Sequence, residues 1–390
     1  MNTERKLKIL HVGKFYPPHM GGIETHLQAL CGELRKTADV RVLVAGDDHR
    51  TSEDLCDGVP VSRLANLCTL AATPLCPGMV RRIRHSDADI VHLHWPNPAA
   101  FLAYLASGHS GRLVVTYHSD VVRQRVFGAL FEPFLHAVLR RAAAILVGSP
   151  NYLASSAILA KHRERCVVVP FGIELSSFAE CDPKSVSAIR QQHGERVILS
   201  VGRLVYYKGF EHLIRAMVRV DGRLLIIGEG PLRESLEKLA QSLGLSERVI
   251  FLGRVNDLVP YYHAAQVFAL ASVARSEAFG IVQIEAMAAG LPVVNTALDS
   301  GVPFVSQNGI TGLTVAPGDA DSLGDALNLL LNDDALRQRF GQAAQKRAAE
   351  EFSLAKMTAR LLDVYDHAAS AAASIVNALQ DAIPADSLER

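Results

Sequence analysis

Two glutamates in the second half of the chain have a spacing that bears on chemistry. Glu277 and Glu285 belong to a segment that predicts a loop, then a helix from about Gly280, ended by Gly290 as its C-cap before a strand. On a continuous helix they would lie about 12 Å apart, too far for the paired carboxylates of a glycoside hydrolase. They could reach opposite ends of one long ligand, with an anion at the helix start between them. Taken alone, Glu277 would most often be a helix cap and Glu285 a solvated helical residue.

A loop earlier in the same half carries two cations. Arg203 and Lys208 lie at 202–209, directly after a strand predicted at 197–201. A guanidinium and an ammonium above the end of a sheet can bind phosphate oxygens, and they stabilise negative charge on a leaving group without a metal ion. Two ordinary surface cations are the alternative. The two glutamates favour the first interpretation.

Histidines mark the ends of two predicted strands in the first half. His118 follows a buried strand, where an imidazole can exchange a proton or a hydrogen bond with a ligand. The same segment could instead be a helix entry capped by Ser119 or Asp120. His92 and His94 alternate along another strand and therefore face one side of the sheet. Such a pair can bind metal, but no third ligand is evident, so strand-end packing, with contact of His94 to an acceptor substrate, is favoured.

Adjacent glycines, Gly21 and Gly22, follow the first predicted strand and precede a helix. They would let the backbone approach a ligand closely, although a plain strand-to-helix turn explains them as well. The pattern is not G-x-G-x-x-G, which argues against a dinucleotide-dependent hydride transfer. Two Asp-x-Asp runs, at 87–89 and 319–321, invite a metal site, but the first leads into a strand and the second opens a helix. We therefore expect no metal.

Short apolar runs alternate with longer amphipathic stretches along the whole chain, which is typical of βα units around parallel sheets. The region from about 170 to 195 mixes proline, glycine, serine and charge, and we place a hinge there. Each half then has its own doubly wound sheet, and ligands should bind beyond the strand ends, in a cleft between the two. Strands are predicted at 9–12, 40–45, 90–94, 113–117, 145–148 and 167–169, and at 197–201, 224–227, 249–252, 267–270, 293–295 and 313–315.

Composition indicates a globular protein of two domains. The 390 residues are 49% hydrophobic and 21% charged, which excludes disordered, collagenous and coiled-coil proteins. No apolar run approaches the roughly 18 residues of a membrane span, and the start lacks the apolar core of a signal peptide, so a cytoplasmic protein is expected. Lys+Arg and Asp+Glu balance at 40 each, but residues 1–172 hold 20 and 14, a net +6, which leaves 20 and 26, a net −6, for the rest. A basic half suits an anionic membrane or a phosphate-bearing acceptor, although it also arises by chance.

The sequences Glu-Ala-Phe-Gly at 277–280 and Glu-Ala-Met-Ala-Ala-Gly-Leu-Pro-Val-Val at 285–294 resemble the signature of the retaining family-4 glycosyltransferases. That family has the α/β GT-B fold, in which two Rossmann-like doubly wound domains face each other across a cleft. The resemblance covers nearly the whole chain. It implies that Glu277 lies near the sugar of a nucleotide-sugar donor and that Glu285 binds the ribose hydroxyls. The backbone at the diphosphate would be that of Ala278, Phe279, Gly280 and Ile281.

The same resemblance implies roles for the other residues. Arg203 and Lys208 match the family's phosphate-binding pair, and His118 matches a histidine that contacts the transferred sugar. We therefore take His118, Glu277, Arg203 and Lys208 as the candidate catalytic residues, and we assign His94 and Asp120 to the acceptor. The remaining donor-binding residues that it implies are Gly21 and Gly22 at the diphosphate and sugar, and Gly230, Arg254 and Val255 around the base.

The expected domains are an acceptor-binding one at 1–172 and a nucleotide-sugar-binding one at 173–354, with a C-terminal helix at 355–382 that packs back on the first. In the linker, Phe171 stands where the family usually has Asn, which leaves the contacts there open. An amphipathic stretch at 123–141 could lie against a membrane or a lipid-linked acceptor, or be an ordinary buried helix.

The activity that this resemblance implies is metal-independent, retaining transfer of a hexose, with the nucleotide sugar as substrate and no cofactor. Segments at 116–120, 131–134 and 140–142 resemble bacterial O-antigen and exopolysaccharide transferases that use GDP-mannose or GDP-rhamnose. The acceptor would be a growing glycan, lipid-linked, in surface polysaccharide or lipopolysaccharide synthesis. A UDP-glucose or UDP-N-acetylglucosamine enzyme and a catalytically silent partner subunit are the alternatives. Peripheral association with the anionic inner membrane is a further expectation, and nucleic acid is not an expected partner.

Overall fold

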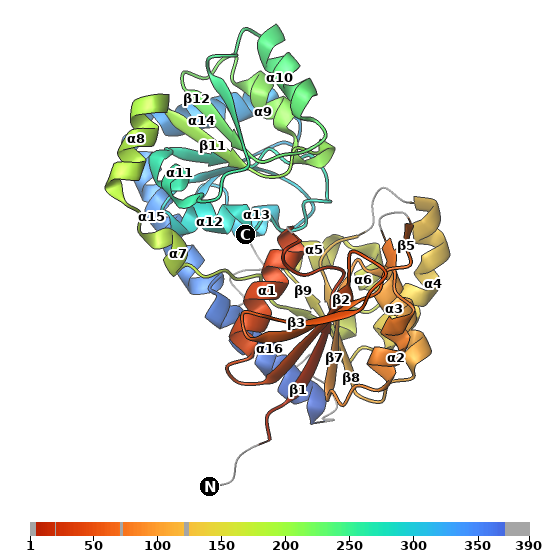
Figure 1. Ribbon diagram of the computed structural model, residues 1–390. Coiled ribbons are helices and arrows are strands. Elements are labelled where there is room, and N and C mark those ends of the chain that lie inside the picture. Colours follow the sequence, from red (N-terminus) through yellow and green to blue (C-terminus); the bar gives the residue numbers. More distant parts are fainter. Residues whose placement is uncertain (1–4, 20, 71–72, 121–124, 371–390) are drawn as a thin grey trace. The chain divides into compact units, whose positions relative to one another are not determined.

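The computed structural model describes residues 5–19, 21–70, 73–120 and 125–370 (Figure 1). The chain forms two compact units. The N-terminal unit takes its described residues from Met1–Phe171 and Leu354–Arg390, and the C-terminal unit is Gly172–Ser353. Helix α16 (Leu354–Ala369) belongs to the N-terminal unit, where it packs against α1 (Gly22–Leu34) and β8 (Arg112–Tyr117). Residues 371–382 of the predicted C-terminal helix lie outside the described residues.

The N-terminal unit is built on a sheet with the strand order β10-β9-β8-β7-β1-β2-β4-β3, in which only β3 runs antiparallel to its neighbour. A short hairpin, β5 with β6, stands apart from it. Besides β8, its strands are β1 (Lys8–Val12), β2 (Asp39–Ala45), β3 (Ser52–Cys56), β4 (Val59–Leu64), β5 (Cys68–Leu70), β6 (Thr73–Leu75), β7 (Ile90–Trp95), β9 (Ala144–Val147) and β10 (Cys166–Val168). Besides α1 and α16, its helices are α2 (Gly78–Arg84), α3 (Pro98–Ser107), α4 (Arg125–Arg141), α5 (Pro150–Ser155), α6 (Ala157–Ala160) and the 3-10 turn η1 (Arg163–Arg165).

The C-terminal unit has a parallel sheet with the strand order β13-β12-β11-β14-β15-β16. Mainly leucine side chains of α9, α10 and α14 form its core with valine, leucine and isoleucine side chains on one face of the sheet. Its strands are β11 (Val197–Val201), β12 (Arg223–Ile227), β13 (Val249–Gly253), β14 (Val267–Ala269), β15 (Val293–Thr296) and β16 (Gly312–Val315). Its helices are α7 (Ser176–Ala179), α8 (Pro183–His193), η2 (Tyr206–Lys208), α9 (Phe210–Ala216), α10 (Arg233–Ser242), α11 (Val259–Ala264), α12 (Val282–Ala288), α13 (Val302–Val305), α14 (Ala320–Asn332) and α15 (Asp334–Glu351).

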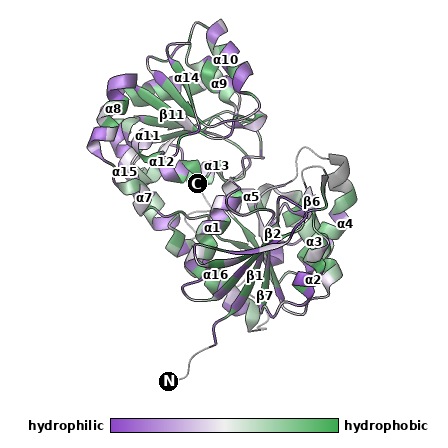
Figure 2. Cartoon of the chain, viewed as in Figure 1, coloured by the Kyte–Doolittle hydropathy of each residue, from purple (hydrophilic) through white to green (hydrophobic). Residues whose placement is uncertain are grey.

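Every strand predicted from the apolar runs is present, with its ends within one residue of the prediction. The central strands of both sheets are largely hydrophobic (Figure 2) and buried, which is why the runs stand out in the sequence. Strands β3, β5 and β6 escaped prediction because they lie largely at the surface; four of the five residues of β3 are exposed. Strand β4 lies inside the sheet, but its buried residues Val59, Val61 and Leu64 are interrupted by exposed or polar ones and so form no apolar run. Helix α8 also lies in the region expected to be irregular, where Asp182 caps it and proline occupies its first turn.

In each sheet, successive strands are added outward in one direction from a certain point and then in the other. This switch point lies between β1 and β7 in the N-terminal unit and between β11 and β14 in the C-terminal unit. In doubly wound sheets the loops at such a point diverge and leave a crevice for ligands. The candidate residues after β1, β7 and β8 and those after β11 and β14 lie at these two places. Within the described part of the chain, no helix is both long and apolar enough to cross a membrane.

Candidate active site

The loops after β11 and β14 bring Lys208 and Glu277 together. Lys208 Nζ lies 2.6 Å from Glu277 Oε2, and each side chain is only 10% exposed. Ser272 Oγ donates a second hydrogen bond to the same carboxylate oxygen at 3.1 Å. Burial alone would lower the pKa of Lys208, but the neighbouring carboxylate outweighs it and the pKa is raised, so the ammonium stays charged. A buried ion pair adds little stability once desolvation is counted, and a perturbed charge pair beside a switch point is typical of a functional site.

Glycines allow these loops to approach each other. Gly209 has a φ of +65°, and a Cβ there would lie 1.9 Å from the carbonyl oxygen of Ala271, at the start of the loop that leads to Glu277. A Cβ at Gly230 would lie 2.4 Å from the carbonyl oxygen of Leu204, in the loop that carries Lys208. Gly230 was expected to border the base of the donor. Backbone packing alone already requires glycine at this position, so its presence is no evidence of a ligand contact.

The other predicted cations of this unit lie at its surface. Arg203 is exposed on the same loop as Lys208, and Arg254 is exposed directly after β13, with Val255 half-buried beside it. Tyr206 Oη lies 3.2 Å from Ser276 Oγ and so links the loop of Arg203 to that of Glu277. The switch point between β11 and β14 thus brings together the exposed guanidinium of Arg203, the buried ammonium of Lys208 and the carboxylate of Glu277.

Glu285 is half-buried in α12, where the hydroxyl of Tyr262 donates to its Oε2 at 2.7 Å. Burial raises the pKa of Glu285, and the hydrogen bond from Tyr262 and the charge of Lys208 act in the opposite direction. Tyr262 was not anticipated from the sequence, since a tyrosine in a helix is ordinarily a core residue.

The helix that carries Glu285 is shorter than predicted. It begins at Val282 rather than Gly280, because Gly280 has a φ of +76° and cannot be its first turn. The prediction of its end is confirmed: Gly290 has a φ of +79°, and the amide of Leu291 donates to the carbonyl of Ala286 at 2.9 Å in a Schellman motif. A helix of seven residues has a weak dipole, so the anion site expected at its start rests only on the family resemblance.

In the N-terminal unit, Gly21 and Gly22 open α1 after β1. The carboxylate of Glu24 lies over Gly21, since a Cβ there would be 2.2 Å from Glu24 Oε2. A Cβ on Gly22, by contrast, would meet nothing within 4 Å. The protein itself therefore does not require glycine at 22, which leaves room for approach of a ligand.

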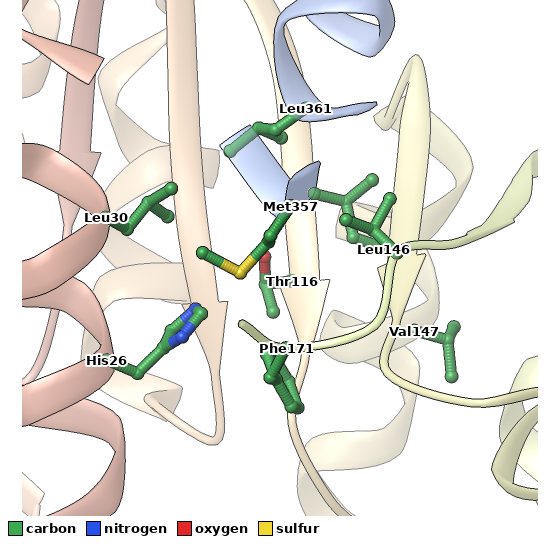
Figure 3. Close-up of a pocket in the computed structure, with 9 residues that line it drawn as sticks. His26, Leu30, Thr116, Leu146, Val147, Phe171, Met357 and Leu361 are labelled. Atoms are coloured by element: carbon green, nitrogen blue, oxygen red, sulfur yellow. The ribbon is translucent and has the colours of Figure 1, made fainter. Parts of the chain in front are cut away.

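His118 follows β8 and is 8% exposed. Its ring stacks on Phe171, with centroids 5.3 Å apart and planes at 13°, and the ring of His26 meets it edge-on. This contact explains the phenylalanine at the position that departs from the family. The rings of His26 and Phe171 also line a small cavity, together with Leu30, Thr116 and Met357 (Figure 3). Burial holds the pKa of His118 well below its usual range, so the ring is neutral.

The two residues assigned to the acceptor differ in environment. Asp120 is half-buried, and its carboxylate accepts hydrogen bonds from Tyr117 Oη at 2.7 Å and Ser156 Oγ at 3.1 Å. His94 is 2% exposed, and both of its ring nitrogens face other imidazoles. We therefore no longer assign His94 to direct contact with an acceptor.

A buried cluster of imidazoles underlies His118. His92 and His94 face the same side of β7, as expected, and His11 of β1 pairs with His92 in register. The expectation that no third ligand stands near the pair is wrong, because ring nitrogens of His11, His92 and His94 lie within 4.8 Å of one another, as three metal ligands would. Sequence spacing hides His11, which comes from another strand. Tyr365 of α16 also reaches the cluster and carried no signal in the sequence.

The aspartates of the two Asp-x-Asp runs serve local structure. Asp319 caps α14 by accepting from the amide of Ser322 at 2.9 Å, as predicted. Asp89 accepts from the backbone amide of Lys8 at 3.0 Å and thereby joins the start of β1 to the start of β7.

Comparison with known proteins agrees with this architecture. The family described as "Glycosyl transferases group 1" matches residues 183–347, and that described as "Glycosyltransferase Family 4" matches residues 20–177. The chain is 32% identical to O-antigen chain mannosyltransferase C of Escherichia coli, over 92% of this chain and 98% of that protein. It is 31% identical to the D-rhamnosyltransferase WbpZ of Pseudomonas aeruginosa, over 89% and 92%.

A third relative, a GDP-mannose-dependent alpha-(1-6)-phosphatidylinositol monomannoside mannosyltransferase of Mycolicibacterium smegmatis, is 30% identical over 91% of this chain and 97% of that protein. Among solved structures, sucrose-phosphate synthase from Thermosynechococcus elongatus superposes with a TM-score of 0.80 at 23% identity, over 94% of this chain and all of that one.

The family matches and the relatives define a glycosyltransferase, and the architecture is the GT-B fold, two Rossmann-like units with the strand orders and switch points described above. The chain belongs to the family-4 glycosyltransferases, as its resemblance to their signature implied.

Proposed function

We propose that the protein is a retaining glycosyltransferase that moves a mannosyl or rhamnosyl group from a GDP-sugar to a growing, lipid-linked surface glycan. The observation that carries this proposal is the likeness, over nearly the full length, to an O-antigen mannosyltransferase and a D-rhamnosyltransferase. A third relative, named for its dependence on GDP-mannose, supports guanine as the base of the donor.

The cations at the β11–β14 switch point suit the leaving group. As the bond between the anomeric carbon and the diphosphate oxygen breaks, the electron pair leaves with the diphosphate, whose negative charge grows. Lys208 is held in place by Glu277 at 2.6 Å, and Arg203 on the same loop is exposed to solvent. Both cations can therefore bind the diphosphate oxygens. This arrangement supplies the charge stabilisation that a metal ion provides in other enzymes.

The two glutamates act at different parts of the donor. Glu277 comes from the loop after β14, beside Lys208, and lies near the sugar in this proposal. Glu285 is oriented by Tyr262, and a carboxylate that accepts one tyrosine hydroxyl keeps further lone pairs for the two hydroxyls of a ribose. Loss of the tyrosine hydroxyl should therefore affect binding of every nucleotide alike, whatever its base.

The N-terminal unit receives the acceptor in this proposal. His118, neutral and largely buried, would contact the transferred sugar by a hydrogen bond rather than by charge. Asp120 lies two residues after His118, and two hydroxyl groups hold its carboxylate in place. The carboxylate is partly exposed and can accept a hydrogen bond from a hydroxyl of the acceptor glycan. On a retaining path the new bond forms on the face of the sugar that the diphosphate leaves.

A surface of the N-terminal unit supports peripheral contact with an anionic membrane. Leu130 and Phe134 of α4 are 70% and 48% exposed, and Leu70 of β5 is 61% exposed. Helix α3 contacts both α4 and β6, the hairpin partner of β5, so the two elements that carry these side chains belong to one region of the unit. Arg140 and Arg141 lie exposed at the end of α4. Apolar side chains flanked by cations are the composition of an interfacial surface; cytoplasmic, peripheral placement follows from this proposal.

The donor is tested by measuring which nucleotide sugar raises the melting temperature, in a panel of GDP-mannose, GDP-rhamnose, UDP-glucose and UDP-N-acetylglucosamine. We expect a GDP-sugar to give the largest shift, and the anomeric configuration of the product to match that of the donor. A shift with UDP-sugars alone would establish the UDP-dependent alternative. Binding without transfer to any lipid-linked acceptor would favour a catalytically silent partner.

A further inference from the structure

Six polar side chains form a row across one face of the N-terminal sheet. His11 lies on β1, His92 and His94 on β7, Thr116 and His118 at the end of β8, and Tyr365 on α16. Their hydrogen bonds run end to end without a branch, and we call them the imidazole chain. The heavy-atom distances are 2.7 Å from Thr116 Oγ1 to His92 Nε2, 2.6 Å from His92 Nδ1 to Tyr365 Oη, 3.4 Å from Tyr365 Oη to His11 Nε2, 3.1 Å from His11 Nδ1 to His94 Nε2, and 3.1 Å from His94 Nδ1 to His118 Nε2.

The imidazole chain is closed to solvent except at one end. His11 and His92 are 0% exposed and His94 is 2% exposed, whereas His118 is 8% exposed. Burial keeps the pKa of each ring below its usual range, so all four rings are neutral. A neutral imidazole has a hydrogen on one nitrogen and a lone pair on the other.

These facts leave two arrangements in which every hydrogen bond forms and Tyr365 both accepts and donates. A third, in which Tyr365 Oη accepts from both His92 and His11, would leave the buried hydroxyl hydrogen of Tyr365 without an acceptor among the described residues. His92, His11 and His94 each use both ring nitrogens in the row, and His118 uses one. Each of the first three rings must therefore accept a hydrogen bond from one neighbour and donate one to the next. Between two neighbouring rings, opposite tautomers would set two N–H groups or two lone pairs against each other, which loses that hydrogen bond. The tautomer of His118 is thus linked to that of His11 and His92, which do not touch it.

The closed end selects between the two arrangements. Thr116 is 4% exposed, and His92 Nε2 is the one hydrogen-bond partner that the described residues give its hydroxyl. A buried hydroxyl hydrogen without an acceptor costs more than an unused lone pair, so Thr116 donates. Every later bond then follows: His92 donates to Tyr365, Tyr365 to His11, His11 to His94 and His94 to His118, each ring from its Nδ1.

We propose that Tyr365 and His94 are positioning residues that, through the imidazole chain, hold His118 as its Nδ1–H tautomer. His118 then presents a hydrogen-bond donor at its open end, which suits a hydroxyl or phosphate oxygen of the bound donor, and it cannot act as a base toward the acceptor. The catalytic consequence rests on the proposed function, but the tautomer does not.

The tautomer is measured directly by long-range proton–nitrogen correlation spectra of protein labelled with ¹⁵N-histidine, with no sugar present. The sequence has 15 histidines, so the His118 signals are assigned by their loss in His118→Asn. We expect His11, His92, His94 and His118 all to be protonated at Nδ1. Four rings protonated at Nε2, or a mixture of the two tautomers, would overturn the proposal.

Tyr365→Phe interrupts the chain without changing its packing. We expect the His118 nitrogen signals to move toward a tautomer average, and kcat with the best donor of the panel to fall about tenfold with little change in KM. Tyr16→Phe is the matched control, since the Tyr16 hydroxyl is buried without a hydrogen-bond partner among the described residues. Should Tyr365→Phe fail to fold, Thr116→Val removes the terminal hydroxyl and should mix the tautomers of all four rings.

Three outcomes separate this proposal from others. His118 signals that neither Tyr365→Phe nor Thr116→Val changes would overturn the positioning role. The expected signals with no transferase activity toward any nucleotide sugar would leave the chain in place and contradict the proposed function. One equivalent of a transition metal in the purified protein, lost in His11→Asn, would show that the nitrogens are metal ligands and overturn the chain.

Discussion

Lys208 Nζ and Glu277 Oε2 lie 2.6 Å apart although each comes from a different loop of the C-terminal unit. If this pair and Arg203 hold the diphosphate of the donor, Lys208→Ala and Arg203→Ala should each remove about 2–4 kcal/mol of transition-state stabilisation, the loss seen when one oxyanion donor is deleted. The measurement is kcat/KM for transfer from the donor identified by thermal shift.

Two controls accompany that experiment. Lys346→Ala removes an exposed cation of α15 in the same unit and should leave kcat/KM unchanged. Lys208→Ala also leaves Glu277 buried without its cation, so its unfolding free energy should fall, whereas that of Arg203→Ala should not, because Arg203 is exposed. Turnover within twofold of the parent for both variants would exclude the assignment.

The sequence predicts the sheets better than it predicts the contacts between loops. Apolar runs such as Ile90–His94 mark buried strands directly, because both faces of a parallel sheet are covered. The contact of Lys208 with Glu277 depends instead on β11 lying next to β14, which is a property of strand order. His11 and Tyr365 are hidden for the same reason, since His92 and Tyr365 are separated by 273 positions. A helical tyrosine gives no local sign that its hydroxyl meets a histidine.

Gly22 offers a test of close approach by the donor. A Cβ at Gly22 or at Gly32 would meet nothing within 4 Å, and both residues lie in α1. Alanine should therefore be tolerated at both positions, and at Gly32, inside the helix, it should add up to about 1 kcal/mol of stability. Only Gly22→Ala should raise the KM for the donor. Equal KM values for the two variants, measured in the same transfer assay, would show that the donor does not approach this backbone.

Activity should survive removal of divalent cations. The cationic groups of Arg203 and Lys208 lie at the switch point where the diphosphate is proposed to bind, and Asp319 and Asp89 of the two Asp-x-Asp runs are engaged with backbone amides. We expect full transfer rates after treatment with EDTA, measured as release of nucleoside diphosphate. Loss of activity with EDTA, restored by magnesium or manganese, would require a metal in the mechanism.

The buried imidazoles should make the N-terminal unit sensitive to acid. Burial lowers the pKa of His11 from 6.5 to about 3 and that of His26 from 6.5 to about 4. These rings stay neutral in the folded state but take up protons in the unfolded state below pH 6.5. The unfolding free energy is therefore unaffected by them above pH 6.5 and falls as the pH decreases, down to about 4 for His26 and about 3 for His11. Each contributes a slope of up to about 1.4 kcal/mol per pH unit, and His92, His94 and His118 shift in the same direction.

Fluorescence of Trp95 can follow this effect, because it is the single tryptophan of the sequence and is 3% exposed in the N-terminal unit. We expect the urea midpoint to fall steadily from pH 7.5 to pH 5.5. His26→Phe should reduce the proton uptake on unfolding by about one, and with it the slope of the unfolding free energy against pH. The substitution removes a titrating ring whose Nδ1 has no partner among the described atoms. A midpoint that is the same at both pH values would contradict neutral, buried histidines.

Binding to anionic vesicles should depend on both charge and apolar contact. Replacing Arg140 and Arg141 by glutamine should weaken binding about 30-fold at low salt, at roughly 1 kcal/mol per cation, and the parent protein should dissociate as salt shortens the screening length to about 8 Å. Replacing Leu130 and Phe134 by serine should weaken binding at every salt concentration, because burial of apolar surface is not screened. Sedimentation with vesicles containing anionic lipid measures both effects.

The choice of arginines in this experiment follows from their contacts. Arg84 is basic and exposed, but its guanidinium donates to the carbonyl oxygens of Ala106 and Ser107 at the end of α3, so its replacement would disturb the fold. Arg140 and Arg141 lie at the exposed end of α4 and can be changed without that effect, and donor affinity should stay constant in these variants. Absence of vesicle binding by the parent protein at every salt concentration would exclude the membrane surface and leave an acceptor that reaches the enzyme in solution.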